Sequence, residues 1–153
     1  MITVKINGEE RQYPQGATYE DVANDYQKEY DNLIALAARD GKIRELFKKL
    51  TRDCEITFFT LKDDVGNKTY VRSATMLFLK AVFDVFGRET VQNCRVEFAI
   101  GNGSYISPKG KINATEENAA KIRNRMRELV EAKTPFLKKS YSLDNAMELF
   151  RRE

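Results

Sequence analysis

The sequence of 153 residues is long enough for one mid-sized domain or two small ones, and its composition of 42% hydrophobic and 32% charged residues is ordinary for a soluble protein. Its formal net charge of +3 is too small to indicate nucleic-acid binding. No stretch resembles a signal peptide or a membrane span, so we expect a cytoplasmic protein without a membrane partner. The chain has no histidine, the usual general base and the commonest transition-metal ligand, which argues against a zinc hydrolase or a catalytic triad and leaves carboxylate or lysine catalysis open.

The first 60 residues predict strands and a helix in alternation. Residues 2–6 alternate apolar and polar side chains as a half-buried strand does, and Asn7-Gly8 is a strong signal for a tight hairpin turn to a second strand at 10–13. Thr18, followed three residues later by Asp21, predicts a capped helix start. The apolar inner face of that helix comprises Val22, Ala23, Tyr26 and Tyr30.

Two further strands complete this first part of the chain. The short apolar run 33–37 predicts an interior strand, Asp40-Gly41 a turn, and residues 53–61 a closing strand. Strands around a single helix within about 60 residues are typical of an α+β fold in which the helix lies across one mixed sheet, as in a β-grasp domain.

The second part of the chain is organised around a long helix. Residues 63–69 are polar and turn-rich and predict a linker. The stretch that follows, Tyr70–Gly87, is apolar on nearly every side and predicts a buried central helix. We expect Met76 in this helix to fill space in the core. The later elements are a strand at 91–100, a turn at Gly101-Asn102-Gly103, a short strand at Tyr105-Ile106, a loop at 108–111, a helix begun by Thr115 and ended by Thr134-Pro135, and a final helix begun by Ser142.

The first 62 residues resemble the TGS domain, a β-grasp module named for threonyl-tRNA synthetase, GTPases and the stringent-response synthetase/hydrolase. The resemblance rests on Ile2-Thr3-Val4 with Asn7-Gly8, on residues 13–23, which are similar to the family's Tyr-Pro-x-Gly-Thr-Thr-x-x-Asp-Ile-Ala, and on residues 54–58. It implies a β-grasp fold for residues 1–62.

Residues 70–153 resemble the second N-terminal domain of threonyl-tRNA synthetase, an α+β editing domain shared with alanyl-tRNA synthetase. Residues 72–77 align with the family's His-Ser-x-x-His-Leu, residues 101–105 with its Glu-Asn-Gly-Phe-Tyr, and residues 142–150 with its Ser-x-x-Glu-Ala-x-Glu-Leu-Phe. The resemblance implies a degenerate and truncated editing domain.

The chemistry of that editing domain is missing from this sequence. Arg72 and Met76 stand where the family has two histidines, and the family's downstream Cys-x-x-x-His does not occur. Arginine is no base near neutral pH and a thioether binds zinc poorly, so we expect no deacylating activity and no metal site. Cys54 and Cys94 are expected to be reduced thiols rather than a disulfide or a metal pair.

Six residues are candidate ligand contacts in the cleft that the resemblance implies: Arg72, Ser73, Lys80, Asn102, Gly103 and Tyr105. Arg72 near a helix N-terminus suits a phosphate, although a surface or salt-bridged arginine is the alternative. Residues 101–103 can equally be a plain turn. The cations of 121–127 alternate in sequence, which favours a solvated helix face over a basic stripe.

Three functions fit these features. The preferred one is a non-catalytic regulatory or ligand-sensing region of a bacterial uridine kinase-like enzyme. No P-loop motif occurs in the sequence, so ATP and Mg²⁺ would belong to a kinase domain outside this chain. The alternatives are a tRNA-binding appendage, or the N-terminal region of a threonyl-tRNA synthetase-like protein that has lost editing. The candidate partners are accordingly a C-terminal catalytic domain and nucleotide or tRNA.

Overall fold

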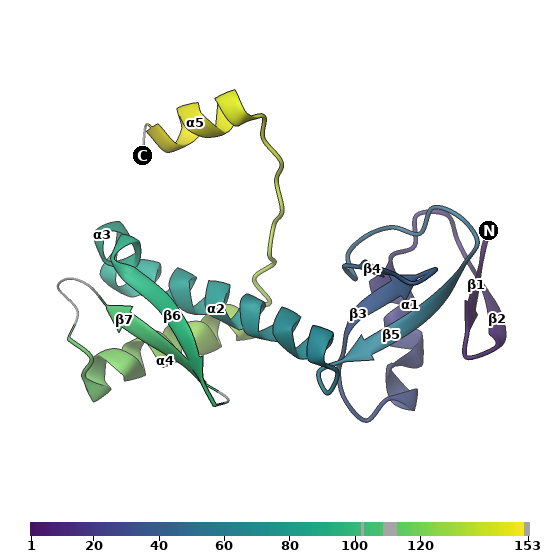
Figure 1. Ribbon diagram of the computed structural model, residues 1–153, viewed down its shortest axis with the longest axis horizontal. Helices are drawn as coiled ribbons and strands as arrows, with labels where there is room; N and C mark the ends of the chain where they lie inside the picture. The colour runs from purple at the N-terminus through teal and green to yellow at the C-terminus, as the bar shows by residue number, and fades with distance from the viewer. Residues whose placement is uncertain (102, 109–112, 152–153) are drawn as a thin grey trace. The chain divides into compact units, whose positions relative to one another are not determined.

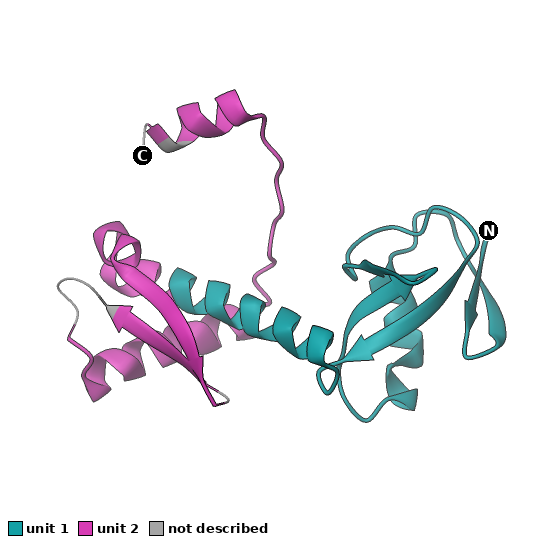
Figure 2. Ribbon diagram, viewed as in Figure 1, with its two compact units in different colours: residues 1–80 teal, residues 81–153 magenta. Residues whose placement is uncertain are grey.

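A computed structural model describes residues 1–101, 103–108 and 113–151 and confirms the α+β class (Figure 1). The chain folds into two compact units, residues 1–80 and 81–153, and the boundary falls inside helix α2, Asp64–Phe86 (Figure 2). No helix of the described residues is long and apolar enough to cross a membrane.

The first unit begins with the predicted hairpin. Strand β1, Ile2–Ile6, pairs antiparallel with β2, Glu9–Tyr13, and the alternate apolar residues of β1 are buried. Asn7 and Gly8 in the turn have φ of 52° and 88°, the left-handed values that a type I′ turn requires at both central positions. The hairpin prediction is therefore confirmed.

Helix α1, Tyr19–Tyr26, starts with a full capping box, also as predicted. The Thr18 hydroxyl accepts a hydrogen bond from the Asp21 amide at 3.1 Å, and the Asp21 carboxylate accepts one from the Thr18 amide at 2.7 Å. These bonds satisfy donors that a helix start would otherwise leave unpaired. A short 3-10 helix, Gln27–Glu29, follows α1.

Five strands form one mixed sheet in the order β2-β1-β5-β3-β4. Strand β3, Ile34–Arg39, and β5, Cys54–Thr60, match the predicted interior and closing strands, and β5 runs parallel to β1. The edge strand β4, Lys42–Arg44, was not predicted, because three residues with two cations show no apolar alternation.

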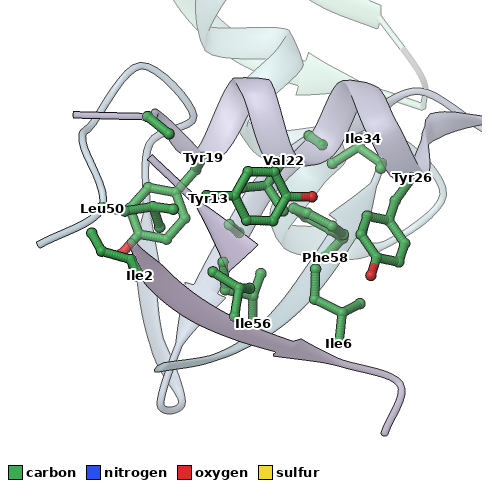
Figure 3. Packing of buried hydrophobic residues seen from close by; sticks show 14 residues of the cluster. Ile2, Ile6, Tyr13, Tyr19, Val22, Tyr26, Ile34, Leu50, Ile56 and Phe58 are labelled. Atoms are coloured by element: carbon green, nitrogen blue, oxygen red, sulfur yellow. The ribbon is translucent and has the colours of Figure 1, made fainter. Parts of the chain in front are cut away.

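The core of the first unit lies between α1 and the sheet (Figure 3). Phe58 at the centre of β5 is 5% exposed, and its ring lies 6.2 Å from that of Tyr26 and 6.0 Å, edge-on, from that of Tyr30. The other large buried side chains of this core are Ile2, Val4, Ile6, Tyr13, Tyr19, Val22, Ile34, Leu50 and Ile56.

Helix α2 corrects two predictions. It begins at Asp64, so most of the expected linker 63–69 is helical, and Arg72 lies more than two turns inside the helix, where the helix dipole acts weakly. Gly66 serves close packing rather than a turn: a Cβ there would lie 2.0 Å from the carbonyl oxygen of Thr60.

The central helix is also less buried than its apolar sequence predicts. Of its described side chains, Ala81 and Val82 are buried, whereas Tyr70, Phe83 and Met76 are 54%, 45% and 61% exposed. Met76 is therefore not the core filler we expected. Hydrophobic periodicity shows which residues share a helix face, and it does not show whether another element covers that face.

The second unit holds the remaining elements. They are α3, Arg88–Gln92; the antiparallel pair β6, Cys94–Ile100, and β7, Gly103–Pro108; α4, Glu116–Glu131; and α5, Leu143–Arg151. The expected loop 108–111 lies, apart from Pro108 in β7, outside the described residues. The predicted caps are present: Thr115 accepts from the Asn118 amide at 3.2 Å and Ser142 from the Asn145 amide at 3.3 Å. Within the described part of this unit only Ala81, Val82 and Leu129 are buried, so its core is small.

Hydrogen-bonded carboxyls, Asp21 and Asp63 among them, make the first unit sensitive to acid. Hydrogen bonds from Thr18 lower the pKa of Asp21, and hydrogen bonds from Thr60 lower the pKa of Asp63. A carboxyl whose pKa is lower in the folded state stabilises the fold above its unfolded pKa, and that stability is lost as the pH falls through the folded value. We therefore expect the thermal midpoint of the first unit to fall as the pH drops below about 4.

The measurement is thermal unfolding by circular dichroism between pH 7 and pH 2. The variant Asp63→Asn should be less stable at pH 7 and should lose less stability on acidification, whereas Asp31→Asn, at an exposed loop position, should follow the parent curve. If the thermal midpoint of Asp63→Asn fell with pH as steeply as that of the parent, Asp63 would not contribute to the acid sensitivity.

Candidate functional site

Three of the six candidate contacts lie on α2 in the first unit. Arg72 and Lys80 are exposed, and the hydroxyl of Ser73 donates a hydrogen bond to the Thr69 carbonyl oxygen at 3.2 Å. The Ser73 hydroxyl is thus satisfied within its own helix, whereas Arg72 is an exposed residue.

The others belong to the second unit. Gly103 begins β7, and Tyr105 in the same strand is 47% exposed and stacks on Phe98 of β6, with ring centroids 5.2 Å apart. Asn102 lies outside the described residues. The candidate contacts are therefore divided between the two compact units rather than gathered within one, and their role as ligand contacts stays a prediction.

The helix face that carries histidines in the resembling family carries an arginine and a thioether here. Arg72 and Met76 are four residues apart on α2, which places them on one face of the helix, and both are exposed. Neither side chain can take a proton from water near neutral pH, and neither is a good zinc ligand. Among the described residues, no three His, Cys, Asp or Glu side chains lie close enough to hold a metal ion. This face offers a positive charge, and neither of its two side chains can act as a general base or a good zinc ligand.

Both cysteines are free thiols. Cys54 begins β5 in the first unit and Cys94 begins β6 in the second, and each is half-buried. Burial raises the pKa of both thiols, so they are poor nucleophiles at neutral pH.

Three of the four cations of α4, those of Lys121, Arg123 and Arg125, are paired with carboxylates, which favours the predicted solvated face over a basic stripe. The ammonium of Lys121 lies 2.7 Å from Glu117, and the guanidinium of Arg123 lies 3.2 Å from Glu116. Arg125 is 2.9 Å from Asp84, whose side chain is only 14% exposed. This pair joins α4 to the last turns of α2, the part of that helix that belongs to the second unit.

One charged feature was missed by the sequence analysis. Residues 39–52, which comprise the end of β3, the edge strand β4 and the loop that follows it, contain six Lys or Arg and two Asp or Glu, whereas residues 1–38 contain three Lys or Arg and seven Asp or Glu. We call residues 39–52 the basic loop. The small net charge of the whole chain conceals this asymmetry, which a sliding charge count along the sequence would have found.

Comparison with known proteins finds relatives that are similar to this chain over nearly its full length. The threonine–tRNA ligase of Thermotoga maritima is 30% identical over 155 aligned positions, covering 98% of this chain and 23% of the relative. The threonine–tRNA ligases of Thermotoga petrophila and Maricaulis maris are 29% and 28% identical, covering 99% and 98% of this chain and 23% of each relative. No family model matches the chain. The chain thus spans about a quarter of the length of these relatives.

This similarity changes the order of the three functional interpretations. It supports a relationship to threonyl-tRNA synthetases along nearly the full chain and gives no support to the uridine kinase-like interpretation that we preferred from the sequence. The synthetase-related alternative fits better.

Proposed function

We propose that this chain is the N-terminal region of a threonyl-tRNA synthetase-like protein that has lost the editing site and retains a role in binding tRNA. In this proposal residues 1–62 are the TGS domain, residues 70–153 are the degenerate editing-like domain, and aminoacylation belongs to a catalytic domain corresponding to the other three quarters of the relatives. The observation that carries the proposal is the exposed Arg72–Met76 pair on α2, in a chain similar to threonine–tRNA ligases over 98% of its length.

The loss of hydrolysis follows from the chemistry of these two side chains. Cleavage of an aminoacyl ester needs a group that activates water, either a base with a pKa near neutrality or a metal ion. The guanidinium keeps its protons at any physiological pH, and the chain has no histidine to act in its place. A guanidinium remains well suited to a phosphate, so the same face can bind RNA without cleaving it.

Deacylation and binding can be measured separately on the 153-residue chain. Serine differs from threonine by one methyl group and is the misacylating amino acid that a threonine enzyme has most difficulty in rejecting, so tRNA specific for threonine and charged with serine is the probe. We expect hydrolysis at the rate of buffer alone, with mild alkali as the positive control for the assay, and salt-sensitive binding of the same tRNA by filter retention. Hydrolysis clearly faster than buffer, and absent from an Arg72→Ala variant, would contradict the proposed loss of editing.

A thermal-shift screen distinguishes this proposal from the alternative of a regulatory or ligand-sensing region. Stabilisation by tRNA and not by nucleotides or nucleosides is expected, because a ligand raises the melting temperature only by binding the folded state. Selective stabilisation by a nucleotide, lost in Arg72→Ala, would favour a nucleotide-sensing region instead.

A further inference from the structure

We propose that the basic loop, residues 39–52, is the surface of the first unit that binds RNA, with its lysines on phosphates and Phe47 under an unpaired base. The inference deepens the proposed function and rests on it in one respect, that the ligand is RNA. It concerns a different part of the chain from the Arg72–Met76 face.

Contacts at its two ends close the basic loop into a compact unit. The guanidinium of Arg39 donates to the Thr51 hydroxyl at 2.9 Å, and that of Arg52 lies 3.0 Å from the Asp40 carboxylate. These contacts join the residues that enter and leave the loop. The cations between them are therefore held within a short stretch of surface instead of being spread along an open chain.

The middle of the basic loop is fixed against the start of α1. The carbonyl oxygens of Leu46 and Lys48 accept hydrogen bonds from the Glu20 and Tyr19 amides at 2.8 and 3.0 Å, and the Leu50 amide donates to the Ala17 carbonyl at 2.7 Å. The side chain of Leu50 is buried in the core of the first unit. A surface ordered in advance loses less conformational entropy when it binds a ligand.

The charge of the basic loop is only partly neutralised from within. Its two carboxylates, Asp40 and Glu45, each face a cation of the same loop, Arg52 at 3.0 Å and Lys48 at 3.4 Å. Lys42 and Lys49 are exposed, and within the described structure neither ammonium lies within 4.0 Å of a carboxylate. The remaining positive charge attracts a polyanion from solution.

An exposed aromatic ring among these cations points to a ligand with bases as well as phosphates. Phe47 is 54% exposed and precedes Lys48 and Lys49 directly, and Ile43 between Lys42 and Arg44 is 50% exposed. Alternating cations and aromatic rings are the features by which proteins hold single-stranded nucleic acid, because every base offers a stacking face. Unpaired RNA, as at the ends and loops of tRNA, is the polyanion that fits both features.

The test compares two double variants of the whole chain that carry the same net charge. Lys42→Glu/Lys49→Glu alters the basic loop, and Lys5→Glu/Lys28→Glu alters exposed lysines on β1 and on the 3-10 helix. Binding of bulk tRNA and of a 12-nucleotide oligouridylate is measured by fluorescence anisotropy from 50 to 200 mM KCl. Circular dichroism checks that each variant is folded.

Three results are expected if the basic loop binds RNA. The loop variant should bind oligouridylate at least ~10-fold more weakly at 50 mM KCl, and its slope of log affinity against log salt should fall by about 1.4, since each phosphate contact on a single strand contributes about 0.7. The control variant should lose much less affinity and keep the slope. Phe47→Ala should weaken binding about 5- to 100-fold and leave the salt slope unchanged, because stacking releases no counterions.

Other outcomes would overturn the inference in distinguishable ways. Equal losses in the two double variants would mean that net charge alone attracts RNA. Binding of tRNA that neither the loop variant nor Phe47→Ala weakens would refute the basic loop as the site and leave the proposed function intact. No binding of either RNA at 50 mM KCl would refute both the site and the tRNA role. Binding of phosphatidylserine vesicles in place of RNA would assign the loop to a membrane surface.

Discussion

Phe58→Ala should lower the free energy of unfolding of the first unit by about 3–5 kcal/mol. Phe58 lies on the central strand β5, and its ring contacts two tyrosine rings, those of Tyr26 and Tyr30. Alanine at this position removes the ring from a closely packed core and leaves a cavity between α1 and the sheet, which neighbouring side chains refill only in part. Such a loss is a large fraction of the stability of a small domain.

Urea unfolding followed by near-ultraviolet circular dichroism reports this change, since four of the seven tyrosines pack in or against this core. Phe59→Ala is the matched control: it removes the same ring from the neighbouring residue, which lies on the other face of β5 and is only half-buried. Its effect should be clearly smaller. Equal losses in the free energy of unfolding for Phe58→Ala and Phe59→Ala would contradict the packing of Phe58, and not Phe59, in the core between α1 and the sheet.

Gly66→Ala should destabilise the first unit by about 3 kcal/mol, although alanine is the better helix former. The new Cβ would lie 2.0 Å from the carbonyl oxygen of Thr60 and 2.8 Å from its carbonyl carbon. Both atoms belong to the backbone of β5, so no rotamer change relieves the overlap, and the first turn of α2 must move away from the strand.

The control for Gly66→Ala is Asn67→Ala in the same turn. Asn67 is exposed, and the bond from its backbone amide to the Asp63 carbonyl oxygen, at 2.8 Å, is kept by alanine, so the substitution should be neutral or slightly stabilising. Hydrogen exchange across residues 60–70 would locate the change. Faster exchange at the start of α2 in Gly66→Ala alone is the expected result, and a stabilised Gly66→Ala would contradict the close contact.

The elements that could be predicted from the sequence are those whose signals are local. Asn7-Gly8 determines its turn through backbone conformation alone, and Thr18 with Asp21 closes a capping box over four residues. Alternation placed the buried residues of β1 correctly, because in a strand with one buried face every second side chain points to that face.

The errors arose where long-range contacts decide the structure. Gly66 next to acidic residues reads as a turn, yet the Asp63 carboxylate accepts hydrogen bonds from Thr60, and the glycine lets α2 start directly against β5. The apolar sequence of α2 could not show which of its faces lack a covering element. Strand β4 exists because β3 offers it an edge, which three isolated residues do not reveal.

The candidate site shows the same division. Arg72 and Met76 could be identified from the sequence only through the resemblance to the editing family's His-Ser-x-x-His, and their four-residue spacing then places them on one face of a helix. The basic loop could not be recognised as one surface, since its closure depends on contacts between Arg39 and Thr51 and between Asp40 and Arg52. Those contacts exist only once β3 and β5 are paired.

The two free cysteines give the chain a built-in reporter of local opening. Each compact unit contains one thiol, at the first residue of a strand, and each thiol is partly shielded from solvent. A bulky disulfide reagent reacts with such a thiol mainly when the strand end detaches, so the two modification rates measure how often each unit frays. Because the second unit buries far less apolar surface, Cys94 should be labelled well before Cys54, and mass spectrometry of the two peptides would follow both within a single sample.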